Sequence, residues 1–320
     1  MKLAFILDPL ESIKPKKDSS FALMREAAAR NHQLFVMQQK DLAWKHDKVV
    51  GFACSLAIKE ITQASDRWYQ IGETKETPLH AYDAVLMRKD PPFNMEYIYS
   101  TYLLELAENQ GAHIINSPRA LRDYNEKLSI ARFHQFIAPT LVTREEGLIR
   151  DFLNEHRDIV LKPLDGMGGA SVFRLHLSDH NINVILETLT HYGTRTIMAQ
   201  RYLPEISAGD KRIIVIAGKT VPYALARIPK PGETRGNLAA GGTGIVQPLT
   251  KRDLEIAEAL GKTLRDDGLM LVGLDVIGDF LTEINVTSPT GMQEITRESG
   301  FNVAAMLLDE IEKTIKKPLS

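Results

Sequence analysis

Residues 269–289 read LMLVGLDVIGDFLTEINVTSP, and their two apolar runs predict a β-hairpin. Side chains alternate between the two faces of a strand, so Glu283 and Asn285 point to the same face. Asp275 joins them on that face if it lies opposite Glu283 on the paired strand. Carboxylate and carboxamide oxygens are ligands that Mg²⁺ prefers. These residues alone are equally compatible with a polar face that is merely hydrated.

The register of this hairpin follows from its apolar residues. The apolar faces of the two strands match only if Val276 lies opposite Thr282, which places Asp275 opposite Glu283. A slip of one residue would move Asp275 to the other face. We therefore expect an odd-length loop at residues 278–280 rather than a two-residue turn.

The composition is that of an ordinary globular protein, with 320 residues, of which 44% are hydrophobic and 25% are charged. This length is sufficient for two or three domains. The net charge of −2 gives no indication of a nucleic-acid-binding surface. No apolar run is long enough for a membrane span, and the first one is too short for a signal peptide. The single cysteine, Cys54, excludes an intrachain disulfide and fits the reducing cytoplasm.

The N-terminal third begins with a strand–helix–strand pattern. Strands are expected at residues 3–7 and 33–37, around a helix that Asp18 or Ser19 caps. This pattern predicts a parallel, doubly wound sheet. The Gly-x-Gly-x-x-Gly fingerprint is absent after the first strand, which argues against an NAD or FAD site there.

A further strand is expected at residues 82–87, and Arg88, Lys89 and Asp90 follow it directly. Ligands bind beyond the C-terminal ends of strands in open α/β sheets, so Arg88 is a candidate for holding a substrate carboxylate. The alternative, slightly favoured by the sequence alone, is that Arg88 and Asp90 pair with each other.

A glycine-rich loop, DGMGGAS at residues 165–171, lies between strands expected at residues 159–161 and 172–175. Without Cβ atoms, its backbone N–H groups can approach phosphate oxygens closely. The loop lacks the Gly-Lys-Ser/Thr ending of a Walker A loop and is closer to the glycine-rich hairpin of kinases. Lys162, at the end of the preceding strand, suits a phosphate contact, although a snorkelling surface lysine is the alternative.

Three other segments carry candidate binding groups. The helix predicted at residues 125–136 carries Lys127. A strand at residues 197–202 offers backbone N–H and C=O groups to a purine edge. Arg212 and Arg227 lie on later expected strands.

The segment at residues 229–244 is a second glycine-rich loop, with five glycines and the single arginine Arg235. Loops of this length in a compact domain are usually lids or binding loops, or disordered. Its composition favours a lid that closes with Arg235 on a charged ligand.

Four motifs give these segments a common interpretation: MRKDPPF at residues 87–93, LKPLDGMGG at 161–169, TRGNLAAGG at 234–242 and LTEINVTSP at 281–289. Their order resembles that of the ATP-grasp superfamily, and their sequences resemble bacterial glutathione synthetase over essentially the whole chain. The resemblance implies an α/β (α+β) ATP-grasp fold, in which an N-terminal Rossmann-like parallel sheet accompanies two ATP-grasp subdomains that clamp ATP. The expected domains are a substrate domain (1–122), a central lid subdomain (123–202) and a C-terminal subdomain with the metal hairpin (203–320).

The resemblance also implies a reaction. ATP phosphorylates the cysteinyl carboxylate of γ-glutamylcysteine, and the amine of glycine then attacks the acyl phosphate to give glutathione, ADP and phosphate. The implied cofactors are ATP and Mg²⁺ (or Mn²⁺). A cytoplasmic homotetramer is expected, with small-molecule substrates and no nucleic-acid or membrane partner.

Each role in this reaction is assigned by the resemblance to particular residues. The phosphates, adenine and ribose of ATP are assigned to Lys127, Lys162, Asp165, Gly166, Met167, Gly168, Gly169, Ser171, Gln200, Tyr202, Leu203 and Asp210. The metal is assigned to Asp275, Glu283 and Asn285, and stabilisation of the developing charge to Arg212, Arg227 and Arg235. The substrates are assigned to Arg88, Asp90, Ser19 and Asn237.

Two rival hypotheses remain. Another ATP-grasp ligase, such as a D-alanine–D-alanine or glutamate-adding enzyme, shares the metal hairpin, but the motifs at residues 88–92 and 234–238 argue against it. A nucleotide-binding module without turnover, similar to the ATP-grasp fold of synapsins, would bind ATP but release no ADP. The full metal set and the lid arginine favour an enzyme.

Overall fold

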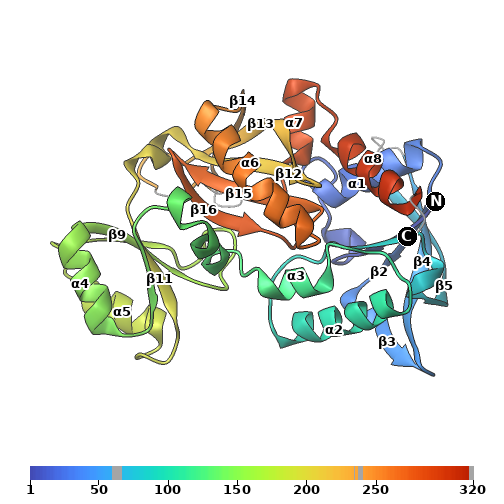
Figure 1. The fold of residues 1–320 in the computed structure, drawn as a ribbon, viewed down its shortest axis with the longest axis horizontal. Coiled ribbons are helices and arrows are strands. Elements are labelled where there is room, and N and C mark those ends of the chain that lie inside the picture. The colour runs from blue at the N-terminus through green and yellow to red at the C-terminus, as the bar shows by residue number, and fades with distance from the viewer. Residues whose placement is uncertain (60–66, 234, 237–240, 317–320) are drawn as a thin grey trace.

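The computed structural model describes residues 1–59, 67–233, 235–236 and 241–316, which form three β-sheets flanked by helices. The sheets follow one another along the chain, from the blue N-terminal sheet through the green central one to the orange C-terminal one (Figure 1). A mixed α/β fold with separate N-terminal, central and C-terminal sheets is the architecture that the sequence predicts.

The N-terminal sheet has seven strands, in the order β3-β4-β2-β1-β6-β7, with β5 paired to β4. Strands β2, β1, β6 and β7 are parallel, so the predicted doubly wound opening is confirmed. The long strand β4 pairs with three neighbours, β2, β3 and β5. The elements are β1 (Lys2–Ile6), η1 (Leu10–Ser12), α1 (Ser19–Ala29), β2 (Gln33–Met37), η2 (Gln39–Asp41), β3 (Leu42–Lys45), β4 (Lys48–Ile58), β5 (Tyr69–Pro78), η3 (Leu79–Ala81), β6 (Ala84–Met87), α2 (Met95–Asn109), β7 (Ile114–Ile115) and α3 (Pro118–Asp123).

The central sheet is antiparallel, in the order β10-β9-β11-β8, and two helices cover it. Ile149 and Leu153 of one helix and Leu186 and Leu189 of the other are buried with the sheet in a separate small core. The elements are β8 (Thr140–Thr143), α4 (Glu146–His156), β9 (Asp158–Pro163), β10 (Phe173–His176), α5 (Ile182–Thr190) and β11 (Ile197–Arg201).

The helix predicted at residues 125–136 is shorter than expected and is not an α-helix. The segment forms the 3₁₀ helix η4 (Leu128–Phe136), and its backbone is non-helical at Phe133. Asn125 explains the change, because its Oδ1 accepts hydrogen bonds from the backbone N–H groups of Lys127, at 3.1 Å, and Leu128, at 2.9 Å. Such side-chain turns compete with the helical hydrogen bonds of the backbone. Lys127 therefore lies in a turn ahead of the helix.

The C-terminal sheet is antiparallel, in the order β14-β13-β12-β15-β16. Helix α6 begins with a capping box between Thr250 and Asp253 and packs against β12, β13 and β15. The elements are η5 (Pro204–Ala208), β12 (Asp210–Ile216), β13 (Lys219–Ile228), β14 (Thr243–Pro248), α6 (Lys251–Asp266), β15 (Leu271–Ile277), β16 (Phe280–Asn285), α7 (Met292–Ser299) and α8 (Val303–Lys316).

The β15–β16 hairpin has the predicted pair Asp275 and Glu283, but for a different reason. Ile277 pairs with Phe280, so the turn is two residues long, and the odd-length loop expected at 278–280 is wrong. Val276 pairs with Leu281 rather than Thr282, because a β-bulge leaves Thr282 as the extra residue. The Thr282 hydroxyl donates a hydrogen bond to the Asp275 carbonyl oxygen at 3.1 Å. The bulge restores the register that the odd loop was expected to provide.

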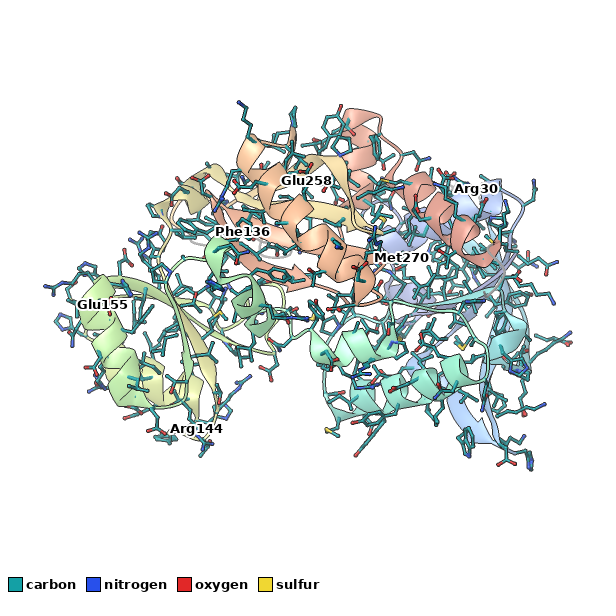
Figure 2. The ribbon with its side chains drawn as sticks, viewed as in Figure 1. Arg30, Phe136, Arg144, Glu155, Glu258 and Met270 are labelled. Atoms are coloured by element: carbon teal, nitrogen blue, oxygen red, sulfur yellow. The ribbon has the colours of Figure 1, made fainter. Side chains whose placement is uncertain are left out.

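Asn116 joins the N-terminal domain to this hairpin. Its buried Nδ2 donates to the carbonyl oxygens of Leu271 and Val286, both at 2.8 Å. Its Oδ1 accepts from the N–H groups of Met270, at 2.8 Å, and Leu271, at 2.9 Å. Met270 lies where the C-terminal sheet meets the N-terminal domain (Figure 2). One amide side chain thus uses both of its donors and accepts twice, holding the start of β15 and the end of β16 together.

Candidate active site

A cavity of about 120 Å³ lies between the central and C-terminal sheets. Eleven of the residues assigned from the sequence line it, and they come from both sheets and both glycine-rich loops: Lys127, Lys162, Gly166, Gly168, Gly169, Gln200, Tyr202, Leu203, Asp210, Arg235 and Glu283. The sequence did not identify Val160, Val172, Arg201, Ile206, Gly236, Ile277 and Thr282, which complete the lining. The apolar residues of this group lie on or near strands that carry assigned residues. Alternation along a strand is a pattern shared by too many residues to have identified them.

Three residues expected at this cavity lie elsewhere in the structure. Met167 lines a neighbouring cavity, and Asp165 forms an ion pair with Arg195. Ser171 has a φ of 57° and is not among the residues that line the cavity. The turn at residues 168–169 has positive φ at both glycines, which is why glycine is needed there.

The two lysines reach the cavity from different elements, Lys127 from the turn before η4 and Lys162 from β9. Lys127 Nζ donates to the Gly166 carbonyl oxygen at 2.6 Å and lies 3.5 Å from Glu283. Lys162 is 7% exposed, so it is a buried lysine rather than a snorkelling surface lysine. Burial lowers the pKa of Lys162, and the nearby Glu283 carboxylate opposes that effect. Lys127 also pairs with Glu126, whereas Lys162 makes no ion pair with the described residues, so Lys162 is the buried cation that a phosphate group would benefit most.

Arg235 connects the two glycine-rich loops. Its Nη1 donates to the Gly169 carbonyl oxygen at 3.3 Å, and its Nη2 lies 2.7 Å from Glu233. Arg235 of the second loop therefore contacts the first loop directly. Asn237, assigned to the substrates, lies outside the described residues.

Arg212, Arg227, Asp210 and Asp275 form a buried charge network on β12, β13 and β15. Asp275 accepts from Arg212 Nε at 2.6 Å and Nη2 at 3.1 Å, and Arg227 Nη2 lies 2.9 Å from its Oδ2. Burial opposes ionisation of Asp275, but the two arginines hold its pKa below the ordinary value. Arg227 Nη2 also donates to Asp210. The two arginines are thereby fixed in orientation before any ligand binds.

The pKa of Asp210 is shifted in the opposite direction to that of Asp275. Burial raises the pKa of Asp210 to about 7, Arg227 opposes the rise, and the Asp275 and Glu283 carboxylates add to it. Its Oδ1 is buried and has no hydrogen-bond partner among the described residues. Because Asp210 lines the cavity, this oxygen is available to a ligand donor.

The hairpin face offers hard oxygen donors to a divalent cation. Glu283 has a side chain that is 25% exposed at the cavity. Asn285 Nδ2 donates to Asp275 Oδ2 at 3.2 Å, and its Oδ1 makes no hydrogen bond to the described part of the chain. No cluster of three His, Cys, Asp or Glu side chains suited to a metal occurs among the described residues. The donors fit Mg²⁺ bound by one carboxylate and one amide oxygen, with phosphate oxygens and water completing its octahedron.

A second cavity, of about 240 Å³, lies beside the first. Six assigned residues line it: Asp90, Met167, Gly168, Arg212, Arg227 and Asn285. Thr287, Ser288 and Thr290 are lining residues that the sequence did not single out, although their position directly after the Glu-x-Asn motif was a usable signal.

Arg88 is buried beside this second cavity. Its side chain donates to Ser20 Oγ at 3.1 Å and to the carbonyl oxygens of Thr287, at 3.4 Å, and Pro289, at 3.1 Å. No carboxylate lies within ion-pair distance of Arg88 among the described residues, so the mutual Arg88–Asp90 pair is wrong. Burial lowers the pKa of Arg88, which nearby carboxylates oppose. Ser19 is also buried, and its Oγ has no partner in the part of the chain that the structure describes.

Comparison with known proteins places the whole chain in one group. The family model for the prokaryotic glutathione synthetase ATP-grasp domain matches residues 126–300, and the model for the N-terminal domain matches residues 1–122. The chain is 66% identical to a glutathione synthetase of Nitrosomonas europaea, with 99% of each chain covered. It is 55% identical to a glutathione synthetase of Ralstonia nicotianae, with coverages of 99% and 97%.

Solved structures share the fold at low sequence identity. The D-cycloserine synthetase DcsG has a TM-score of 0.67 at 14% identity, covering 98% of this chain and 100% of its own. The ATP-grasp ligase PsnB, complexed with a minimal precursor, Mg and ADP, has a TM-score of 0.64 at 15% identity, covering 98% of each chain. Among the described residues, no helix has both the length and the apolarity to cross a membrane.

Proposed function

This chain belongs to the prokaryotic glutathione synthetase family, and from this premise we propose that it ligates γ-glutamylcysteine and glycine to glutathione, with ATP converted to ADP and phosphate. The observation that carries the proposal is the adjacency of the two cavities. The first has two buried lysines and a closed glycine loop, and the second is bordered by Arg88 and two arginines. A phosphoryl donor in one cavity would meet a carboxylate in the other at the hairpin face.

ATP is assigned to the first cavity. Lys127 and Lys162 would hold its phosphates, with the residue 165–171 loop over them. The backbone and side chains of Gln200, Tyr202 and Leu203 would contact adenine, as in the hinge of the family. Asp210, with its unpartnered buried oxygen, is the candidate to accept a hydrogen bond from a ribose hydroxyl.

Asp275, Glu283 and Asn285 would hold the divalent metal, with Mg²⁺ as the proposed ion and Mn²⁺ as its alternative. Glu283 and Asn285 have oxygens available at once, whereas both Asp275 oxygens accept from arginine in this structure. When bound, the metal neutralises phosphate charge during transfer.

Arg212 and Arg227 would stabilise the negative charge of the acyl phosphate and of the tetrahedral intermediate that follows. The buried Asp275 fixes both guanidinium groups, so little reorganisation is needed during reaction. Arg235 and its loop would exclude water, because an acyl phosphate exposed to water hydrolyses. No side-chain nucleophile is needed when two substrates are positioned in this way.

The γ-glutamylcysteine carboxylates are assigned to the region of Arg88, Asp90 and Ser19. A buried guanidinium with only neutral acceptors around it gains most from a bidentate carboxylate ligand. Asn237 keeps its proposed substrate role, outside the described residues.

Three broader expectations stay proposals. Boundaries at 1–122, 123–202 and 203–320 are supported by one sheet in each part. A homotetramer is proposed from the family resemblance, and light scattering on the purified protein tests it. A cytoplasmic location is proposed because the reaction consumes ATP and handles a free thiol, which needs a reducing compartment.

The deciding experiment measures ADP release with each substrate omitted in turn. We expect release only when γ-glutamylcysteine and glycine are both present, with glutathione formed in equal amount. Background rates with both substrates, together with stimulation by D-alanine or glutamate peptides, would instead identify another ATP-grasp ligase. ATP binding without ADP release under every condition would identify a binding module.

A further inference from the structure

A third cavity, of about 690 Å³, lies between α1 and α7 at the end of β4. None of its lining residues lines either cavity of the active site. Helix α1 of the N-terminal domain packs against α7, which lies next to β13 and β14 of the C-terminal sheet (Figure 1). The lining residues are Pro15, Lys16, Phe21, Arg25, Ile58, Lys59, Gln293, Thr296 and Arg297.

The charges around this cavity all have one sign. Lys16, Arg25, Lys59 and Arg297 come from four separate segments, and the described lining contains no acidic side chain. Lys16 and Lys59 make no ion pair with the described residues, and Arg25 lies over the Phe21 ring at 5.9 Å. Within the part of the chain that the structure describes, Arg297 alone among these four has an ion-pair partner, Glu298, at 3.0 Å. Four cations gathered around one hollow repel one another, and they focus a positive potential into it.

The remaining lining suits an organic ligand rather than a bare ion. Pro15, Phe21 and Ile58 provide apolar wall, and Gln293 and Thr296 add neutral polar groups. The volume is within the range of small-molecule sites, roughly 300–1,000 Å³. We propose that this cavity binds a small organic polyanion, with two or more carboxylate or phosphate groups, at a site separate from the active site.

The cavity is connected mechanically to the substrate cavity. Gln293 Nε2 donates to the Asp18 carbonyl oxygen at 2.9 Å, and Asp18 caps α1 by accepting from Phe21 N–H at 2.8 Å. Ser20, in the first turn of α1, accepts from Arg88 Nε at 3.1 Å. A polyanion that draws α1 and α7 together would therefore move Ser20, and with it the guanidinium group of Arg88 that donates to Ser20. This coupling rests on the proposed function and predicts a change in KM for γ-glutamylcysteine at unchanged kcat.

The binding experiment uses the full-length protein saturated with Mg²⁺ and a non-hydrolysable ATP analogue, so that the ATP cavity is filled. Tricarballylate and fructose 1,6-bisphosphate are titrated separately by calorimetry, against sodium chloride of equal ionic strength. Binding of tricarballylate would indicate recognition of carboxylate groups, and binding of fructose 1,6-bisphosphate would indicate recognition of phosphate groups. We expect one site per chain, and at least tenfold weaker binding in the double variant K59E/R297E.

The matched control is K48E/K262E, which makes the same charge change at two exposed lysines away from the cavity. We expect its affinity to stay within twofold of the wild type. The proposal is overturned if neither probe binds beyond the salt effect, if K59E/R297E binds like the wild type, or if γ-glutamylcysteine displaces the probe competitively. Failure of the proposed ligase function would appear only in the ADP-release assay and would leave the binding isotherm unchanged.

Discussion

Arg212 and Asp275 face each other on adjacent strands and form a two-point ion pair, with Nε and Nη2 at 2.6 and 3.1 Å from the two carboxylate oxygens. Arg227 approaches the same carboxylate at 2.9 Å. One buried acid thus orients both arginines that line the second cavity. Asp275 is therefore central to the electrostatics of the site, whether or not it also ligates metal.

Replacing Asp275 by asparagine is expected to leave buried Arg212 without a counter-charge and buried Arg227 with Asp210 as its remaining carboxylate partner. The expected loss of unfolding free energy is about 3–5 kcal/mol, and turnover should fall at least ~100-fold. Urea denaturation and ADP release measure the two effects. The control is Asp158→Asn, which breaks a pair with the 42%-exposed Arg174 and should cost under ~1 kcal/mol. Equal losses in both variants would contradict the central role of Asp275.

The sequence was sufficient to predict that Asp275 lies opposite Glu283, because the apolar pattern of both strands requires that pairing. The structural feature that produces this pairing, a β-bulge, could not be predicted from the sequence. A bulge at Thr282 and an odd-length loop have the same effect on the alternation, so only the coordinates distinguish them. The burial of Lys162 and the pairing of Asp275 with two arginines depend on contacts between segments that are distant in sequence. No local sequence pattern predicts such contacts.

The 3₁₀ helix after Lys127 shows a second reason why a prediction from the sequence failed. A helix was predicted at residues 125–136, but the side chain of Asn125 accepts hydrogen bonds from the first N–H groups in a local turn. An asparagine at this position is compatible with both a helix cap and a turn, and the helix prediction took no account of the turn. Both predicted glycine-rich loops contribute residues to the first cavity, yet three assigned residues of the first loop do not line it, because the geometry of a loop depends on its packing.

Replacing Glu283 by glutamine should preserve the fold and remove most turnover. We expect kcat to fall ~100- to 1,000-fold, and the Mg²⁺ concentration for half-maximal rate to rise, because an amide is a weaker ligand than a carboxylate. Glu126→Gln is the comparison, since Glu126 also contacts Lys127 Nζ but lies off the hairpin. If the two variants lose activity equally, Glu283 acts through Lys127 and not through a metal.

Removing the Arg235 side chain should uncouple the reaction. Arg235→Ala loses the bond to the Gly169 carbonyl oxygen, so the closed arrangement of the two loops becomes less stable. We expect more phosphate released than glutathione formed, because water reaches the acyl phosphate. The two products are quantified in the same reaction. Arg144→Ala, at an exposed arginine of the central domain (Figure 2), should keep the ratio at one.

Shortening Asn116 to alanine should weaken the junction between the N-terminal domain and the metal hairpin. Four backbone groups at Met270, Leu271 and Val286 would lose their partner in a buried position. Allowing for partial relaxation, we expect a loss of about 3 kcal/mol in urea denaturation. Asn183→Ala breaks one exposed hydrogen bond from Arg150 and should cost under ~0.5 kcal/mol. A similar small cost at Asn116 would show that water replaces the amide.

Glu108 on α2 should make stability fall as pH rises. Burial, with Glu105 adding to it and Arg122 opposing it, raises the pKa of Glu108 from its ordinary value of 4.5 to about 7. Between those two values the folded protein keeps a proton that the unfolded chain has released, so the unfolding free energy decreases with pH through that window. Glu108→Gln should remove this slope and, after discounting for partial exposure, stabilise the protein by about 1 kcal/mol at pH 8. Thermal denaturation from pH 4 to 8 measures it, with Glu155→Gln as the control because that side chain is 73% exposed on α4 (Figure 2). A slope that persists in Glu108→Gln would assign it to another group.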